Sequence, residues 1–149
     1  MSYLDVITLE RAKNYLRIDI DLTDDDTEIE SMIKGALSYI EKRTNHLVYA
    51  RDKTFTGNCQ VKVYDYPINS VVSPENPFVC NFSTFVVYAN DKTVNLNVGY
   101  LTPEEVPDEL IQAALQMLKV WYYESEKQVN TTLIPESVKQ AVDIWRRFI

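Results

Sequence analysis

One run of the sequence constrains the fold more than any other. Between residues 24 and 44 apolar side chains recur every three or four residues, at Ile29, Met32, Ile33, Ala36, Leu37 and Ile40. This period matches the turn of an α-helix, so the apolar stripe predicts a helix with one buried face. Thr23 is the predicted N-cap and the three aspartates after it the predicted acidic first turn, whereas Lys42, Arg43 and Asn45 predict the end of the helix. We therefore predict a helix over about residues 24–44.

The middle of the chain changes to a two-residue period, which is typical of β-strands. Val, Tyr, Phe and Thr, which favour strands, are frequent between residues 51 and 100. In the run Lys92–Tyr100 the apolar positions alternate with polar ones, which predicts one buried face. Asn90-Asp91 separates this run from Thr84–Ala89, so a β-hairpin is predicted here. The proline-bearing segment 67–81 is expected to be an ordered loop or an edge strand, and a candidate contact loop.

Three further helices are predicted, over about residues 9–17, 107–124 and 135–148. Thr8 is a candidate N-cap for the first, and prolines stand at the starts of the other two. The fold class is therefore α+β. We expect a predominantly α four-helix bundle with a small antiparallel sheet or β-hairpin inserted over about residues 51–100. All 149 residues are expected to form one domain.

Composition and charge limit the classes of function that the chain can have. The formal net charge is −7, which disfavours a surface that grips a phosphate backbone. Only three glycines occur, and no glycine-rich phosphate-binding loop is present. Cys59, Cys80 and His46 cannot form a four-ligand zinc site without carboxylates, and we expect both thiols to be reduced. The sequence from Met1 to Asp5 has no signal-peptide pattern and no run could span a membrane, so we expect synthesis in the cytoplasm.

Two features of the sequence are candidate sites of chemistry. Asp19–Glu30 partly matches a calcium-binding loop, but Asp24 stands where that loop needs glycine. An acidic helix start is favoured, and occupation by a divalent ion stays open. His46, the only histidine, has no nucleophile or metal-binding motif beside it, so we interpret it as a solvated or capping residue. We predict no catalytic residue, no cofactor, no metal ligand and no enzymatic activity.

The chain ends in Trp145-Arg146-Arg147-Phe148-Ile149. Arg and Trp are common at interface hot spots, so this terminus is a candidate contact. The alternative is an ordinary helix C-terminus, where cations are favoured, with Trp145 and Phe148 in the core. The same two interpretations apply to most of the ten tyrosines, which suit interfaces and cores alike.

Several segments form a recognisable set in their order along the chain. They are Ile7–Ile18, the helix through Ile29-Glu30-Ser31-Met32-Ile33 to Thr44, Tyr66-Pro67-Ile68-Asn69-Ser70-Val71, Val106–Glu124, Ile134-Pro135-Glu136-Ser137-Val138, and Trp145-Arg146-Arg147-Phe148. This ordered set resembles the small head-tail connector family of tailed phages, and the resemblance spans nearly the whole sequence.

The resemblance implies a non-enzymatic virion component. Such subunits form a ring, commonly of about twelve copies, between the portal protein and the tail-completion or stopper proteins. DNA passes through the lumen without specific binding, and a negative wall would let it slide. The expected locations are the host cytoplasm during assembly and the head–tail interface of the virion.

Within such a ring each subunit has two different faces for its neighbours. Our candidate interface residues are Tyr88, Asn90, Asp91, Phe78 with the loop from Val72, and Arg146, Arg147, Phe148 and Ile149. The alternative function is a small soluble adaptor or interaction module outside a virion. A metal-dependent or hydrolytic enzyme is a third class.

Overall fold

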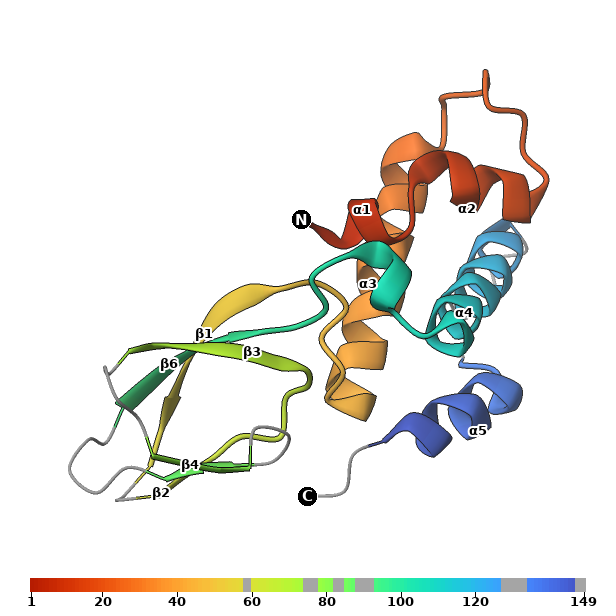
Figure 1. Cartoon of the computed structure of the whole chain (residues 1–149). Coiled ribbons are helices and arrows are strands. Elements are labelled where there is room, and N and C mark those ends of the chain that lie inside the picture. The colour runs from red at the N-terminus through yellow and green to blue at the C-terminus, as the bar shows by residue number, and fades with distance from the viewer. Residues whose placement is uncertain (58–59, 74–77, 82–84, 88–92, 127–133, 147–149) are drawn as a thin grey trace.

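The computed structural model describes residues 1–57, 60–73, 78–81, 85–87, 93–126 and 134–146. Two parts make up the chain. The helices lie together in one part, and the strands lie together in the other. The strands lie beyond the C-terminal end of helix α3 (Asp26–Thr44) (Figure 1). The chain is thus a mixed helix-and-strand protein, as the predicted α+β class requires.

The helical part is organised around one long helix, α3, which contacts α1, α2, α4 and α5. Ile29, Ile33, Leu37 and other apolar side chains of α3 are fully buried in its core, together with side chains from the four other helices. The α-helices are α1 (Tyr3–Val6), α2 (Leu9–Leu16), α3 (Asp26–Thr44), α4 (Asp108–Glu126) and α5 (Glu136–Trp145), and a short 3-10 helix η1 (Pro103–Glu105) precedes α4.

The ends of the helices follow local rules, with one correction. Thr8 caps α2 as predicted, because its hydroxyl accepts a hydrogen bond of 3.2 Å from the backbone N–H of Arg11. Asn45 ends α3 in the left-handed conformation that the sequence predicts, with φ of 60°. The predicted Thr23 cap is wrong: Asp25 is the N-cap residue, and α3 begins at Asp26.

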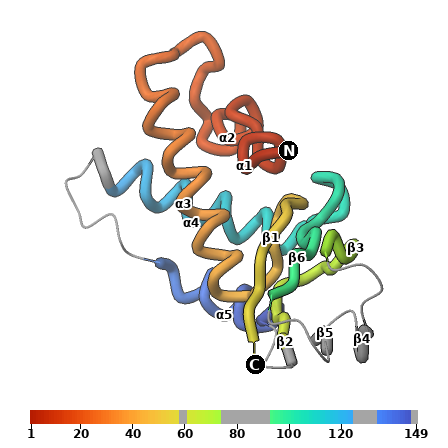
Figure 2. The backbone as a smooth tube through the Cα atoms, turned by 90° about the vertical axis from the view of Figure 1, so that its left-hand side faces the viewer, coloured from red at the N-terminus to blue at the C-terminus, as the bar shows by residue number. Residues whose placement is uncertain are grey.

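The predicted four-helix bundle is not confirmed. In Figure 1, α2 and α5 lie across the axis of α3, and Figure 2 shows that α4 also crosses α3. The short α1 adds another contact with α3. Each helix therefore uses its apolar stripe to cover a different length of α3.

Within the described ranges, the strands form two antiparallel sheets of three strands each. One sheet has the order β1-β6-β3 and the other has the order β2-β5-β4. Figure 2 shows β6 between β1 and β3, with β2 nearby below them. The strands are β1 (Arg51–Thr56), β2 (Gln60–Lys62), β3 (Ile68–Ser73), β4 (Phe78–Asn81), β5 (Phe85–Val87) and β6 (Thr93–Val98).

A second apolar core lies between the sheets. Val94, Leu96 and Val98 of β6 are fully buried, which confirms the alternation predicted from the sequence. Val61 of β2 and Val63, just after it, pack against them from the other sheet. The sheets therefore share one small core that is distinct from the helical core.

The predicted hairpin is wrong, because β5 and β6 belong to different sheets. β6 pairs instead with β1 over the full register from Arg51–Val98 to Thr56–Thr93, and with β3 on its other side. Pairing with two strands satisfies the backbone of β6 on both edges, which a single hairpin partner does not do. Segment 67–81 was predicted to be an ordered loop or an edge strand. It contains β3, which is an edge strand, and also β4.

Gly99 is required where β6 leaves the sheet. Its φ is +114°, and a Cβ at this position would lie 2.1 Å from the backbone oxygen of Tyr49. Only glycine combines that conformation with that close approach. A separate observation concerns membranes: none of the helices in the described ranges is long and apolar enough to cross a bilayer.

Candidate assembly surfaces

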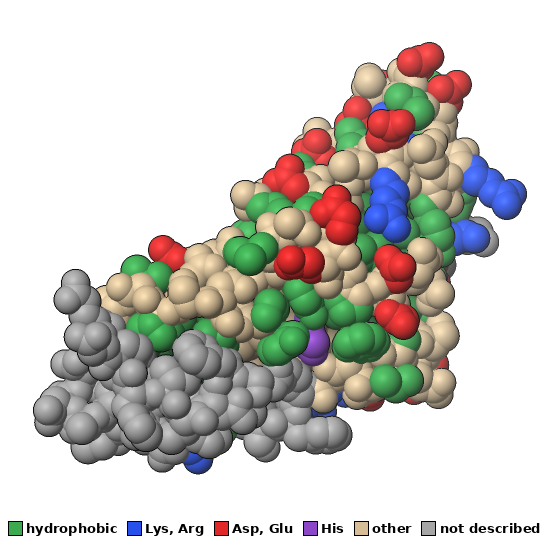
Figure 3. Space-filling model, viewed as in Figure 1, with side chains coloured by type: hydrophobic (Ala, Val, Ile, Leu, Met, Phe, Trp, Pro, Cys, Tyr) green, Lys and Arg blue, Asp and Glu red, His purple; other side chains and the backbone are tan. Residues whose placement is uncertain are grey.

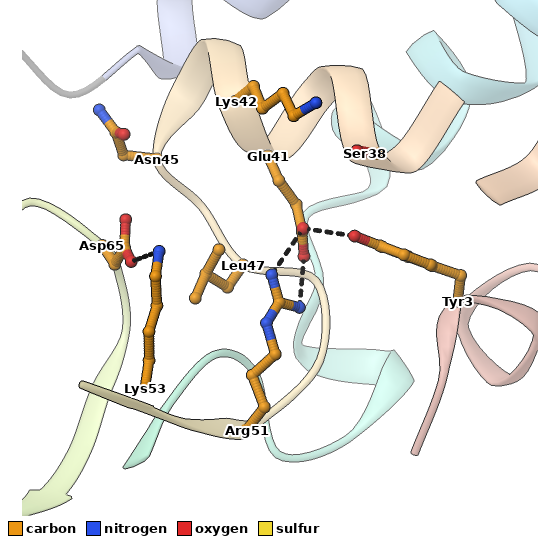
Figure 4. A pocket seen from close by; sticks show the side chains of 9 residues that line it. All are labelled: Tyr3, Ser38, Glu41, Lys42, Asn45, Leu47, Arg51, Lys53 and Asp65. Carbon is orange, nitrogen blue, oxygen red and sulfur yellow. Dashed lines mark hydrogen bonds and ion pairs between the residues drawn. The ribbon is translucent and has the colours of Figure 1, made fainter. Parts of the chain in front are cut away.

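The helical part and the sheets meet at a buried carboxylate, Glu41. It belongs to the last turns of α3 and is 6% exposed. Its carboxylate accepts hydrogen bonds from the Tyr3 hydroxyl at 2.7 Å and from the Val48 backbone N–H at 2.9 Å. Arg51 of β1 donates two more, at 3.0 and 2.8 Å (Figure 4). Glu41 therefore joins α1, α3 and β1 at one point.

This junction meets the requirements for burying a charge. A buried carboxylate is costly unless a cation and several donors compensate it, and the two-pronged guanidinium is the best match for its shape. The Arg51 guanidinium also lies 4.6 Å from the centre of the Tyr49 ring. Tyr49 in turn contacts the edge of Tyr3, with ring centres 5.0 Å apart.

The surroundings of the junction shift two pKa values. Burial and the hydrogen bond to Glu41 raise the pKa of Tyr3 to about 12, since both disfavour the phenolate. Burial alone would lower the pKa of Arg51, but its hydrogen bonds and attraction to Glu41 prevail and raise it. Both groups therefore keep their neutral and cationic forms over the physiological pH range.

Sequence reasoning missed Glu41, although a signal was present. Glu41 follows Ile33 and Leu37 at intervals of four, so it lies on the apolar stripe of α3. A carboxylate on a buried face needs a partner, and this rule could have flagged it. The identity of the partners could not be predicted, because Tyr3 and Arg51 come from distant elements.

An open pocket lies beside this junction, which we call the α3–β1 pocket. Its volume is about 410 Å³. Leu47 lies in the middle of the view in Figure 4, and Lys53 pairs with Asp65 at 2.5 Å on one side of it. Lys42 is exposed and has no ion-pair partner within the described ranges. The pocket is lined by Tyr3, Ser38, Glu41, Lys42, Asn45, Leu47, Arg51, Lys53 and Asp65.

The interpretation of His46 as a solvated residue is wrong. His46 is 6% exposed, and its Nδ1 shares a hydrogen bond of 2.8 Å with the Tyr100 hydroxyl. Its ring also contacts the rings of Tyr66 and Trp145, at centre distances of 5.1 and 5.7 Å. His46 is buried because Asn45 ends α3 and turns the chain inward, between α5 and the sheets.

The structure tests the C-terminal candidates only in part. Trp145 packs inward, so the alternative that places it in the core is correct for this residue. Arg146, the next residue, is exposed. Phe78 begins β4, but its side chain is outside the description. The other candidates, Tyr88, Asn90, Asp91, Arg147, Phe148 and Ile149, lie outside the described residues.

The acidic stretch before α3 is tied down by a buried lysine. Lys13 of α2 is 2% exposed, and its ammonium donates to the backbone oxygens of Ile20 and Leu22, at 3.1 and 2.6 Å. It also forms an ion pair with Asp26 at 2.5 Å. We call residues 19–25 the acidic tip, and Figure 3 shows carboxylates gathered at that end of the molecule. Among the described residues, no group of three or more His, Cys, Asp and Glu side chains is placed to hold a metal ion.

One family of known proteins matches part of the chain. Residues 6–72 match the family described as "Phage gp6-like head-tail connector protein". The matched region runs from the end of α1 to β3. It includes the acidic tip, Glu41 and Arg51, and all of the lining of the α3–β1 pocket except Tyr3. The match confirms the resemblance seen in the sequence: residues 6–72 are similar to the gp6-like head-tail connector family. None of the curated proteins matches the sequence.

Solved structures of similar fold extend the likeness to the whole chain. A chain of the virion of the native gene transfer agent (GTA) particle has a TM-score of 0.72 and 17% identity, over 97% of this chain and 91% of that one. A chain from the neck of the empty GTA particle has a TM-score of 0.71 with the same identity and coverage. A third, from the neck of the native GTA particle, has a TM-score of 0.67 and 16% identity, over 97% and 90%. At these identities the likeness concerns the fold.

Proposed function

We propose that this head-tail connector protein forms a ring between the portal and the tail of a phage-like particle. One observation carries the proposal. The family match covers the region that joins helices to sheet, and a chain from the neck of the empty GTA particle has a similar fold over nearly the entire chain. The subunit would act as a structural component, without catalysis.

The symmetry of the similar particles supports a ring. Two of the neck structures were computed with C6 and C12 symmetry. We propose about twelve copies here as well, each presenting one face to the preceding subunit and a different face to the next. The net charge of −7 suits a wall past which DNA slides without binding.

The partners we propose are the portal protein on one side and tail-completion or stopper proteins on the other. The C-terminal residues Arg146–Ile149 are a candidate contact. Trp145 is held against His46, so the chain leaves α5 from a fixed point, and Arg146 is exposed directly after it. Tyr88, Asn90, Asp91 and Phe78 remain further candidates. Assembly would take place in the host cytoplasm, and the final location would be the virion neck.

Light scattering tests the proposal. The molar mass of the chain is measured alone and after mixing with purified portal particles from the same genome. We expect ring-sized assemblies in at least one condition and their loss when residues 146–149 are removed. Trp145 is kept in this variant so that its contact with His46 survives, and thermal unfolding checks that it does. A matched control, Gln140→Ala on the exposed side of α5, should assemble normally.

A chain that stays monomeric and ignores the portal at high concentration would overturn the connector ring. That result would favour a soluble adaptor that works outside a virion.

A further inference from the structure

Two apolar side chains of the acidic tip are held in an exposed position. Ile20 is 50% exposed and Leu22 is 60% exposed. The backbone oxygens of these same two residues accept hydrogen bonds from the buried Lys13, so the backbone faces the protein. Tyr122 of α4 adds a hydrogen bond of 2.7 Å to Asp25. A loop anchored in this way presents apolar side chains for contact, because their exposure is unfavourable in a free subunit.

The α3–β1 pocket has the complementary character. Its lining contains three cations, Lys42, Arg51 and Lys53, and two carboxylates, Glu41 and Asp65. Glu41 is bonded to Arg51 and Asp65 to Lys53, so Lys42 supplies the excess positive charge. Leu47 adds an apolar surface to the lining. The pocket therefore suits an occupant that combines apolar side chains with carboxylates.

The acidic tip of a subunit cannot reach its own pocket. The tip precedes the N-terminus of α3, whereas Ser38, Glu41 and Lys42 line the pocket from its C-terminal turns. Along α3, Ser38 is 12 residues and Lys42 is 16 residues beyond the first residue, Asp26, a distance of about 18–24 Å in an α-helix. Figure 1 shows the tip and the sheets at opposite ends of the molecule. Any contact between them joins two copies.

We propose that the acidic tip of one subunit docks in the α3–β1 pocket of the next subunit around the ring. Ile20 and Leu22 pack toward Leu47, and the carboxylates of Asp21 and Asp24 approach Lys42 and Lys53. A contact between two different surfaces repeats head to tail and closes into a ring when the rotation between copies permits it. The inference rests on the proposed function, since it names the contact by which the ring forms.

The charge distribution favours this contact, because it offsets the electrostatic repulsion between copies. Copies that each carry a net charge of −7 repel one another. Placing the acidic tip at the local excess of cations turns part of that repulsion into attraction. The attraction is between partly exposed groups, so added salt should weaken it.

Two complementary variants test the proposal. The tip variant carries Ile20→Ser and Leu22→Ser, which leave intact the backbone oxygens that Lys13 binds. The pocket variant is Lys42→Glu, which lies outside the hydrogen bonds of Glu41. The matched control is Lys34→Glu, the same charge reversal at an exposed position earlier on α3. Molar mass is measured by light scattering over a concentration series. Each variant is measured alone and mixed with portal particles, in the condition in which the unmodified chain assembles.

We expect each variant alone to need an at least about tenfold higher concentration for half-assembly, while Lys34→Glu behaves like the unmodified chain. The decisive sample is the equimolar mixture. The tip variant keeps a working pocket and the pocket variant keeps a working tip, so the mixture should give dimers of one copy of each and no rings.

The possible failures are distinguishable. Rings from either variant at the unmodified concentration, or rings from the mixture, would overturn the tip-in-pocket contact and leave the proposed function standing. A tip variant that forms rings but no longer binds portal particles would assign the tip to another protein and also overturn this contact. An unmodified chain that assembles in no condition would instead overturn the proposed function, and this inference with it.

Discussion

The helical part and the sheet part of this protein are built on different rules. In the helical part, one long helix lies at the centre, and every other helix buries its stripe against it or against a neighbour. In the sheet part, short strands pair into two sheets that share a small core. β6 is the central strand of one sheet, and β5, which precedes it in the sequence, is the central strand of the other. The helical part depends on local periodicity, and the sheet part depends on long-range pairing. We therefore expect substitutions in the two parts to differ in how much they lower the free energy of unfolding and in how many elements they destabilise.

The largest effect is expected in the centre of the helical core. Leu37→Ala removes a fully buried side chain from α3, which should lower the free energy of unfolding by about 3–5 kcal/mol. Urea unfolding followed by the fluorescence of Trp121 and Trp145 measures this, since both lie on helices of this part. Lys34→Ala on the exposed face is the control and should change little. A loss below about 1 kcal/mol would show that α3 is not the centre of the core.

The second effect concerns the junction between the two parts. Glu41→Ala leaves Arg51 and the Tyr3 hydroxyl without their acceptor, and we expect a loss of about 3 kcal/mol. Because the junction couples α3 to β1, hydrogen exchange should become faster in both elements. Glu41→Gln keeps one acceptor oxygen and should lose less. Exchange that accelerates in α3 alone would contradict a coupling role.

A third substitution probes the sheet core. Leu96→Ala removes a fully buried side chain of β6, and we expect about 2 kcal/mol, near the lower limit for such a change, because a small core relaxes more readily. Hydrogen exchange should rise in β1, β3 and β6, with α4 little affected. The exposed neighbour Thr93→Ala serves as the reference. Equal acceleration in α4 would mean that the two parts unfold as one unit.

The smallest effect is a pH dependence at the junction. The pKa of Tyr3 is about 12 in the folded chain, above the ordinary value of 10.0. Its neutral form therefore stabilises the fold below pH 10, and this contribution is lost as the pH rises from about 10 to 12. The unfolding midpoint should fall over that range, and by less in Tyr3→Phe. The same fall in both proteins would show that Tyr3 has no part in it.

The sequence predicted α2, α3, α4 and α5 because each one is specified locally, and it missed the four-residue α1. The stripe from Ile29 to Ile40 and the left-handed Asn45 mark α3 without reference to the rest of the chain. The alternation of β6 was readable for the same reason. Its partners were not, since a strand with one buried face fits many registers until the whole sheet exists. The hairpin prediction chose the nearest partner in sequence, whereas the fold pairs β6 with β1 and β3.

For the candidate surfaces too, local motifs could be recognised in the sequence, whereas the roles of residues with distant partners could not. The resemblance to head-tail connectors was carried by ordered local motifs, and the family match over residues 6–72 confirms it. Glu41, His46 and Lys13 could not be assigned roles beforehand, because their partners lie far away in sequence or belong to the backbone. His46 looked solvated because it follows a helix end, and only the packing of Trp145 and Tyr100 buries it.

The sequence by itself determined the approximate positions of α2, α3, α4 and α5, the buried face of β6 and the resemblance to head-tail connectors. Each of these depends on residues within a few turns or strand positions of one another. Only the tertiary structure decided which strands pair, which polar side chains are buried, and that the acidic tip and the α3–β1 pocket lie at opposite ends of α3. The physical reason is that burial, ion pairing and strand pairing depend on distances between residues far apart in the chain, and folding alone sets those distances.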